Sequence, residues 1–481
     1  MHTHTYNILT KRALGVLLLF HAHTLAGCIE EDPTEELDPH TLWKSSGELY
    51  PGGETTEDLL LGSNAFISPA ENISTEHEMM FFSGNSFFNQ AWVQAPASTK
   101  NRDGLGPLFN ARSCSACHFK DGRGEPPTEI NPDAIGLLLR LSVPGEDEHG
   151  GPMHHATYGN QLQPLSLPDV LPEADFRIVN TEVQGTYADG STYTLHKPSY
   201  VIENYNYGEP GDDLMVSPRI APQMIGLGLL EAIPEERLLE LADPDDTDND
   251  GISGKVQRVW SPEAQQHLVG RFGWKGDAPT VRQQVAGAFL GDMGITSPVN
   301  RSGECNPTQM SCLEHQTTEE MEIDPGNFDR VVVYSSLLAV PVRKPKNIEQ
   351  IQQGKELFSQ ANCAACHTPS HITGNTTDLK ETHDQLIWPY TDLLLHDMGE
   401  ELADHRPVFE ASGREWKTPP LWGTGRIKQV NKHQRLLHDG RADGVEEAIL
   451  WHGGEAAASR DAFKSMTKEE RDALVAFVDS L

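Results

Sequence analysis

The chain has 481 residues, of which 37 are Lys or Arg and 71 are Asp or Glu, giving a formal net charge of -34. So acidic a protein repels the phosphates of nucleic acids and anionic lipids, which excludes a nucleic-acid-binding role and adhesion to membranes through a basic surface. The length predicts two domains, or three, and after residue 30 no stretch reaches the roughly 18 apolar residues that a membrane-spanning helix requires.

Residues 1–28 have the pattern of a bacterial export signal. Lys11 and Arg12 precede the apolar run ALGVLLLF, and LAGC at 25–28 places small residues before Cys28. The pattern resembles a lipoprotein signal, in which Cys28 is acylated and begins the mature chain; an ordinary signal peptide with an incidental cysteine is the alternative. We therefore expect the protein on the periplasmic or cell-surface side of a bacterial membrane, lipid-anchored through Cys28. Residues 29–62 are acidic and interrupted by prolines, which predicts a flexible tether.

Two copies of one five-residue pattern follow, CSACH at 114–118 and CAACH at 363–367. C-x-x-C-H is the attachment signature of c-type haem, because two sulfurs form thioether bonds to the porphyrin edge and the adjacent imidazole reaches the iron. The alternatives are a shared four-cysteine zinc site and a thioredoxin-like dithiol. The histidine after each cysteine pair favours two covalently bound haems, held by Cys114, Cys117, His118, Cys363, Cys366 and His367.

An insertion follows the first motif, at about 136–216. It contains LLLRLSV at 137–143 and then alternating β-branched and aromatic residues around the turn YADGSTY. This pattern predicts a β-hairpin with companion strands. Its role stays open between covering the N-terminal haem, binding a partner and filling space.

An acidic loop at 243–254 spaces Asp246, Asp248 and Asp250 two residues apart, with Gly251 next. Carboxylates that converge around a turn glycine predict a calcium site. The twelfth loop position is Gln257 rather than glutamate, so the loop is not an ordinary EF-hand, and a solvated acidic loop is the alternative.

Cys305 and Cys312 are the cysteines that neither the signal nor the two motifs use. They lie seven positions apart, and an exported protein reaches a compartment that permits disulfides. We predict a structural disulfide between them.

The second half repeats the order of the first. SPRIAPQMIGLG at 217–228 corresponds to KTPPLWGTG at 417–425, and WKGDAPTVRQQV at 274–285 to HDGRADGVEEAI at 438–449. Before the second motif, Ile348, Ile351, Leu357 and Phe358 have helical spacing. The predicted fold is therefore mainly α, with two cytochrome c-like domains at 63–342 and 343–481, the first enlarged by the β-containing insertion.

These stretches also carry a specific resemblance. GLGPLFNARSCSACH, APQMIGLGLLEAI, DGISGK, GRFGWKGDAPTVRQQVAGAFLGDMGIT and LHDGRA resemble the dihaem oxidoreductase family often labelled "thiol oxidoreductase". That family is related to the bacterial dihaem cytochrome c peroxidases and to the dihaem enzyme that matures methylamine dehydrogenase. The resemblance runs from about residue 100 to the end. It implies one electron-transfer haem and one haem that meets peroxide, whereas no cysteine is left over for thiol chemistry.

The resemblance also assigns a sixth iron ligand. The peroxidases place methionine fourteen residues after the histidine of HDG, where this chain has His452, so the C-terminal haem is expected to be bound by His367 and His452. A second imidazole in place of a thioether lowers the reduction potential. In the alternative, His452 caps the HGGE turn and Met398 binds the iron. His438 of HDG is expected either next to the ligands or at the surface.

Three further residues match functional positions of the peroxidases. Trp274 corresponds to the tryptophan between the haems, Gln284 to a glutamine of the peroxide pocket, and Asp292 lies two residues from the position of the catalytic acid. The alternatives are core packing for Trp274 and a surface position for Asp292. The removable distal histidine of the peroxidases is replaced by Ala134, which implies an open N-terminal haem unless an insertion histidine binds it: His149, His154, His155 or His196.

The sequence thus predicts an exported dihaem c-type oxidoreductase with peroxide-linked chemistry at the N-terminal haem. A small redox protein is the expected electron partner, with a protein substrate as a further possibility. The alternatives are a non-catalytic dihaem electron-transfer cytochrome and a surface protein that binds metal or haem iron.

Overall fold

The computed structural model describes residues 46–481, except 60, 129, 317–320 and 344. The export signal with Cys28 and most of the tether lie outside the described residues. Within them, no helix combines the length and apolar character needed to cross a bilayer.

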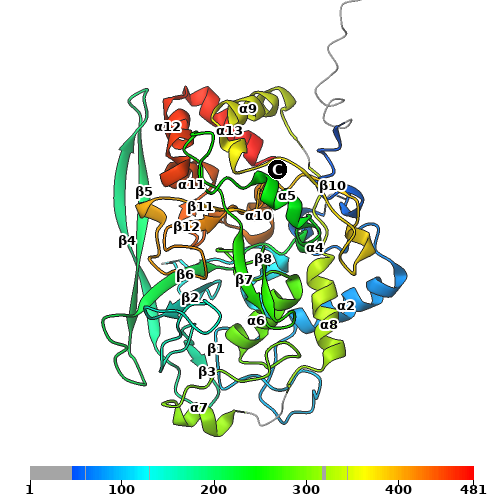
Figure 1. Ribbon diagram of the computed structural model, residues 1–481, viewed down its shortest axis with the longest axis vertical. Helices are drawn as coiled ribbons and strands as arrows, with labels where there is room; N and C mark the ends of the chain where they lie inside the picture. The colour runs from blue at the N-terminus through cyan, green and yellow to red at the C-terminus, as the bar shows by residue number, and fades with distance from the viewer. Residues whose placement is uncertain (1–45, 60, 129, 317–320, 344) are drawn as a thin grey trace, which may run out of the picture. The chain divides into compact units, whose positions relative to one another are not determined.

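The described chain is a mixture of helices and strands, 31% helix and 19% strand, so the prediction of a mainly α fold of cytochrome c-like domains was wrong. The strands form seven two-stranded sheets among the described residues, and several of these lie in the C-terminal part (Figure 1). The chain contains 32 Pro and 42 Gly, which shorten helices and leave connecting backbone that pairs locally as short strands.

Three helices build the core around the first motif. Helices α2 (Thr75–Asn89) and α8 (Pro325–Ser336) pack against each other, and α6 (Val281–Met293) packs on α8. A Cβ at Gly84 of α2 would lie 2.0 Å from the carbonyl oxygen of Arg330, so this crossing requires glycine. Their apolar faces meet in a buried cluster that includes Phe81, Val285, Phe289, Phe328 and Tyr334.

The insertion forms β-strands, and some of them pair with strands that are distant in the sequence. Strand β2 (Leu137–Ser142) pairs antiparallel with β6 (Met215–Ile220). In the sequence between these two strands, the long strands β4 (Asp175–Thr186) and β5 (Thr192–Glu203) form a separate hairpin around the YADGSTY turn. A third pair is β7 (Gln257–Ser261) with β8 (Gln266–Gly270).

The β4–β5 hairpin reaches the C-terminal part of the chain, as Figure 1 shows beside α11 and α12. At its tip, Tyr187 donates its hydroxyl to Glu446 at 2.7 Å, and the amide of Ala188 donates to the carbonyl of Lys464 at 3.0 Å. Arg471 donates to Asp189 at 3.0 Å. The insertion therefore contacts both halves of the chain.

In the second half, α9 (Ile348–Gln360) leads into CAACH and packs on α13 (Lys468–Val478). The prediction of helical structure before this motif is confirmed. A Cβ at Gly354 would lie 2.0 Å from the carbonyl oxygen of Ala473, which explains the glycine at this contact. The other helices here are α10 (Thr424–Asn431), α11 (Val445–Trp451) and α12 (Ala457–Ser465).

The remaining elements are short. The helices are α3 (Cys114–Cys117), α4 (Leu227–Glu231), α5 (Glu235–Leu241) and α7 (Met310–His315). The strand pairs are β1 (Leu108–Phe109) with β3 (Leu165–Ser166), β9 (His371–Ile372) with β10 (Leu386–Ile387), β11 (Leu395–Asp397) with β12 (Glu415–Lys417), and β13 (Arg435–Leu436) with β14 (Ala442–Asp443). The 3₁₀ turns are η1 (Gly53–Thr55), η2 (Gly62–Asn64), η3 (Phe119–Asp121), η4 (Cys363–Ala365), η5 (Lys380–Thr382), η6 (Glu400–Leu402) and η7 (Gly454–Ala456).

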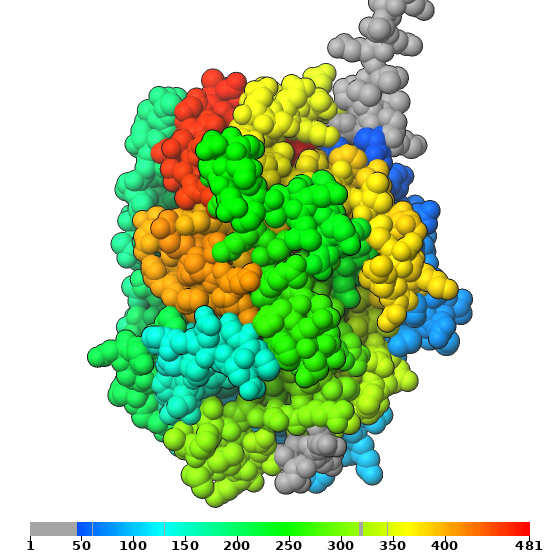
Figure 2. Space-filling model, viewed as in Figure 1, coloured from blue at the N-terminus to red at the C-terminus, as the bar shows by residue number. Residues whose placement is uncertain are grey.

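The two halves share buried side chains. The cluster around the first motif includes Ile387, Trp422 and Ile427 from the second half. Segments of both halves also adjoin on the face drawn in Figure 2, where green residues of the first half lie against yellow and orange residues of the second. The two halves are therefore packed against each other through a common buried cluster.

Candidate functional site

The first motif lies on α3, with His118 immediately after the helix. Cys114 and Cys117 are free thiols. The Nδ1 atom of His118 lies 2.7 Å from the carbonyl oxygen of Pro222, which fixes the tautomer that leaves Nε2 available to a metal. Burial lowers the pKa of His118, so its imidazole is neutral as a ligand must be.

A cavity begins at this motif and contains about 1350 Å³ of empty space, including the part open to solvent. Cys114, Cys117 and His118 line it together with the three residues that the sequence proposed for catalysis: Trp274, Gln284 and Asp292. Among the described residues, no histidine other than His118 lines this cavity.

Asp292 stands at the C-terminal end of α6, inside this cavity. Its Oδ1 atom accepts a hydrogen bond from Nε2 of Gln161 at 2.9 Å. Burial raises the pKa of Asp292 above its ordinary value, while Arg140 and the Gln161 hydrogen bond act in the opposite direction. A buried carboxyl of this kind is suited to accept and return a proton. Gln284, on the same helix, adds an amide to the cavity wall.

The second motif repeats this arrangement in a second cavity, of about 1410 Å³ including its opening. The Nδ1 atom of His367 lies 3.0 Å from the carbonyl oxygen of Tyr390, and burial lowers the pKa of His367 to about 4. Cys363, Cys366 and His367 line the cavity.

His452 lines the same cavity, and its imidazole is oriented and kept neutral in the same way as that of His367. Its Nδ1 atom lies 2.6 Å from the carbonyl oxygen of Ala448, and burial lowers its pKa. Two neutral imidazoles that each use Nδ1 on a backbone carbonyl therefore border one cavity. Met398, the alternative ligand, also lines it, so both candidates are within the site.

Trp274 lines both cavities. Its indole Nε1 donates to the carbonyl oxygen of Ile220 at 2.8 Å, and the guanidinium of Arg123 lies over its ring, 5.1 Å from the centroid. The indole thus contributes to the wall between the sites of the two motifs.

Two buried cations flank this tryptophan and were missed in the sequence. Lys417 and Arg123 line the second cavity and are 7% and 5% exposed. No residue of the described part of the chain hydrogen-bonds the ammonium of Lys417, and Nε of Arg123 is buried without a partner. Burial lowers the pKa of Lys417 to about 8, although Asp392 and Asp277 favour its charged form. Since a haem carries two carboxylates, two buried cations in the cavity wall fit that group. Lys417 gives one sequence signal, its position directly before TPP.

A second missed group surrounds His396. Its two ring nitrogens lie 2.8 Å from Asp392 and 2.7 Å from Glu455, and its Nδ1 lies 3.6 Å from Sγ of Cys366. Hydrogen bonds to the two carboxylates and to Cys366 outweigh burial and raise the pKa of His396 well above its ordinary value. The sequence offers no signal for this group, because Glu455 is 59 residues away.

His438 is buried, 4% exposed, and lines the second cavity, stacked on Trp416 with ring centroids 3.8 Å apart. Burial lowers its pKa to about 3, although the neighbouring carboxylate of Asp439 acts in the opposite direction. The structure therefore places it beside the site and away from solvent.

The other predicted positions lie apart from the two cavities. The carboxylates of Asp246, Asp248 and Asp250 converge to within 4.8 Å of one another, on an exposed loop. The insertion histidines are elsewhere: His149 stacks on Trp260, His154 lines a third cavity, His155 contacts the carbonyl of Pro210, and His196 lies on β5. Ala134 lies in a turn before β2.

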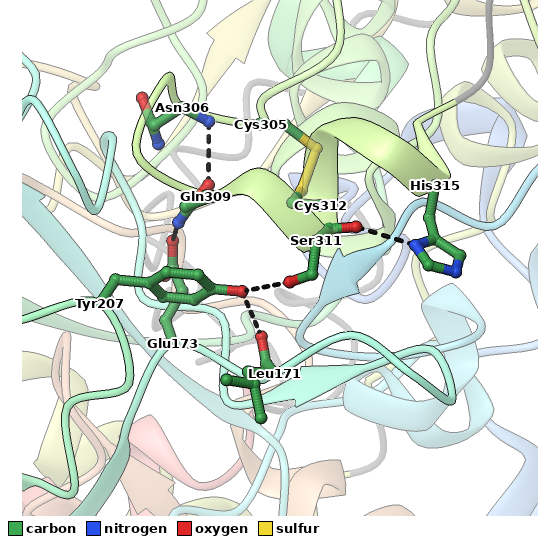
Figure 3. Close-up of a disulfide and its surroundings, with 9 residues drawn as sticks. All are labelled: Leu171, Glu173, Tyr207, Cys305, Asn306, Gln309, Ser311, Cys312 and His315. Atoms are coloured by element: carbon green, nitrogen blue, oxygen red, sulfur yellow. Dashed lines mark hydrogen bonds between the residues drawn. A yellow bond between two sulfur atoms is a disulfide. The ribbon is translucent and has the colours of Figure 1, made fainter.

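Cys305 and Cys312 are joined by a disulfide, with Cα atoms 5.6 Å apart (Figure 3). Beside it, Gln309 donates to Glu173 at 2.6 Å, and Figure 3 draws this hydrogen bond as a dashed line. The motif cysteines, in contrast, have no disulfide, and burial raises the pKa of Cys114 and Cys363 to about 12, which makes them poor thiol catalysts.

Two cavities, each bordered by a cysteine pair and a neutral histidine, with a shared indole and a buried carboxyl, define a protein with sites for two redox cofactors. The chain belongs to the family described as "Di-haem oxidoreductase, putative peroxidase", whose model matches residues 48–143 and 168–481. The predicted family is thereby confirmed, and with it haem cofactors and a dihaem redox role.

Other comparisons add little. No curated protein matches the chain. Among solved structures, it is similar to a chain of Kuenenia stuttgartiensis hydrazine synthase pressurized with 20 bar xenon, at 12% identity and a TM-score of 0.32, over 89% of this chain and 96% of that one. A likeness this weak carries no argument.

Proposed function

We propose that the protein is an exported dihaem c-type oxidoreductase that reduces hydrogen peroxide, or uses peroxide to oxidise a protein partner, at its N-terminal haem. The observation that carries this proposal is the first cavity, which a buried carboxyl and an amide line together with the motif histidine and, among the described residues, without a second imidazole. An iron site with one protein ligand leaves a position for a substrate.

Covalent attachment is part of the proposal. Each cavity is bordered by two free thiols and by a histidine whose Nδ1 is held on a backbone carbonyl. In the C-terminal cavity His367 and His452 would bind the iron, and Lys417 and Arg123 would receive the haem carboxylates. These ligands favour a low-potential site for electron transfer.

The chain's own residues supply what a haem lacks. When bound, the haems supply reversible one-electron transfer at iron. Asp292 takes a proton from one oxygen of peroxide and returns it to the other, and Gln161 holds the carboxyl in place during this exchange. Gln284 orients the peroxide through its side-chain amide. The indole of Trp274 provides a path for electrons between the two sites.

The discriminating experiment is an electron paramagnetic resonance spectrum of the ferric protein, made with the cytochrome maturation machinery. One high-spin and one bis-histidine low-spin iron are expected. Two low-spin irons would instead favour a non-catalytic electron carrier. A colourless protein, or zinc at the motif cysteines, would remove the haem assignment altogether. Turnover of peroxide with a reduced small cytochrome tests the activity itself, with Asp292→Asn as the matched variant.

Location and partners belong to the same proposal. We place the protein on the periplasmic or cell-surface side of a bacterial membrane, anchored by a lipid on Cys28 and supplied with electrons by a small redox protein. Metabolic labelling with a fatty acid tests the anchor, and the label is expected to be lost in Cys28→Ser. Labelling that persists in this variant would place the anchor elsewhere.

The last part of the proposal is a calcium ion bound by Asp246, Asp248 and Asp250. The convergence of these carboxylates supports it, and backbone amides of Gly251 and Ile252 hold two of the carboxylates in the loop. Added calcium is expected to raise the melting temperature of the protein, and less so in Asp248→Asn. Equal shifts in the two proteins would exclude this loop.

A further inference from the structure

A third cavity lies beside the first and has no part in the function proposed above. It contains about 1600 Å³ of empty space, including the part that opens to solvent. The disulfide between Cys305 and Cys312 forms part of its wall, in the region drawn in Figure 3. Leu290 and Gly294 line it from the end of α6, the helix that carries Asp292.

Gln161 connects this third cavity to the first. It lines the third cavity, and its Nε2 atom donates to Oδ1 of Asp292 at 2.9 Å and to the carbonyl oxygen of Gly291 at 2.8 Å. Asp292 in turn lines the first cavity, together with His118. A group that contacts Gln161 therefore lies one hydrogen bond away from the carboxyl at the N-terminal haem site.

The wall has hydrogen-bond acceptors in excess of donors. The side-chain amide nitrogens of Gln161 and Gln163 both donate hydrogen bonds to the carbonyl oxygen of Gly291. Their side-chain oxygens have no hydrogen-bond partner, and neither has Oδ1 of Asn160. Gln161 and Gln163 are 2% and 6% exposed, so these acceptors are buried. Buried acceptors without partners are unfavourable, and a ligand that brings N–H groups relieves the deficit.

Acidic side chains outnumber basic ones in the wall of the third cavity. Glu304 lines the cavity, and its carboxylate has no hydrogen bond or ion pair with any residue that the structure describes. Burial raises the pKa of Glu304 to about 7; Arg140 acts in the opposite direction and Asp292 in the same direction, so a bound cation would favour the ionised form of this carboxyl. The basic side chains of the wall are Arg301, which is exposed, and His154, whose pKa burial lowers. The other acidic side chains of the wall are Glu322 and Glu173, and burial raises the pKa of Glu173 to about 8.

We propose that this cavity binds a small organic cation with several N–H donors: an amine, amidine or guanidine. Its charge would pair with the carboxylate of Glu304, and its N–H groups would donate to the side-chain oxygens of Gln161 and Gln163. The ligand would adjoin the N-terminal haem site without reaching it directly, because Gln161 and Asp292 stand between. A neutral molecule of the same shape lacks the charge that Glu304 requires.

Guanidinium tests this proposal, since it has only donors, is always charged and does not bind iron through a free lone pair. Calorimetric titration of the full haem-containing protein is expected to give saturable one-to-one binding, at concentrations far below those that unfold proteins. Urea, the neutral planar counterpart, is expected to give none at the same concentrations. Sodium chloride keeps the ionic strength equal in both titrations.

Three variants locate the site. Glu304→Gln and Gln163→Leu are each expected to weaken guanidinium binding by about tenfold or more, because each removes one named contact. Glu148→Gln is the control, since this glutamate is exposed and does not line the cavity. The haem absorbance and melting temperature of each variant show whether it has folded.

The proposal is overturned if guanidinium gives no saturable heat, if urea binds equally well, or if the control variant weakens binding as much as Glu304→Gln. Binding is measured without turnover and without peroxide. A protein that binds guanidinium but does not turn over peroxide would therefore contradict only the function proposed above.

Discussion

The role of Asp292 gives the sharpest test of the proposed chemistry. In Asp292→Asn the side chain keeps its size, and its oxygen still accepts the hydrogen bond that Gln161 donates at 2.9 Å. The backbone oxygen of residue 292, which accepts from the amides of Asn110 and Ala111, is also unchanged. The substitution therefore removes one function, the transfer of a proton.

The size of the effect follows from that single function. One positioned acid or base contributes about 10²–10⁴-fold to a rate, so kcat/KM for peroxide is expected to fall by this factor, or ~3–5 kcal/mol of activation free energy. The stability should change little, since burial already raises the pKa of Asp292 and disfavours its charged form.

The pH dependence of the activity provides a second test of the role of Asp292. A carboxylate that first accepts the proton of peroxide must be ionised, so activity is expected to fall as the pH drops through the raised pKa of Asp292. Stopped-flow measurement of the reaction between peroxide and the reduced protein, from pH 4 to 8, checks both points. An Asn variant that retained activity within about threefold, or kept the acid limb of the profile, would refute the reasoning.

Three further predictions follow from the site. His452→Met replaces an imidazole with a thioether, so the reduction potential of the C-terminal haem is expected to rise, as spectroelectrochemistry would detect; an unchanged potential would indicate that His452 is not the ligand. Trp274→Phe keeps an aromatic ring but removes the more easily oxidised indole, so electron transfer between the haems should slow while the haem absorbance stays the same; equal rates in flash photolysis would exclude Trp274 from the path. His438 has a pKa lowered to about 3 by burial, so its contribution to stability is present above pH 6.5 and is lost as the pH falls. Between pH 6.5 and 5 this loss amounts to about 2 kcal/mol, and His438→Phe, which keeps the stack on Trp416, should reduce it in urea titrations followed by circular dichroism; an identical slope in both proteins would contradict this assignment.

Features that depend on neighbouring residues could be predicted from the sequence. The helical spacing before CAACH formed α9, and the YADGSTY turn formed the β4–β5 hairpin. The residues proposed around the N-terminal haem, Trp274, Gln284 and Asp292, were drawn from a family resemblance, and the structure brings them into one cavity with His118.

Features that depend on distant partners were not predicted. Strand β2 pairs with β6 across more than 70 residues, and neither strand alone reveals its partner. The mainly α prediction failed for this reason, since short strands with distant partners carry a weak periodic signal. The buried position of Lys417 was missed for the same reason, because in a sequence a lysine predicts an exposed side chain.

The β4–β5 hairpin has a mechanical consequence. Near its base, Phe176 and Ile178 pack against the cluster that contains Leu137, a residue that lines the first cavity. Its tip is tied to Glu446, Lys464 and Arg471 in the C-terminal part of the chain. It therefore acts as a brace across the molecule and resists any hinge motion that would separate the two sites. In the proposed function electrons pass between the two sites, and because tunnelling rates fall steeply with separation, a fixed spacing would keep the rate of that exchange constant.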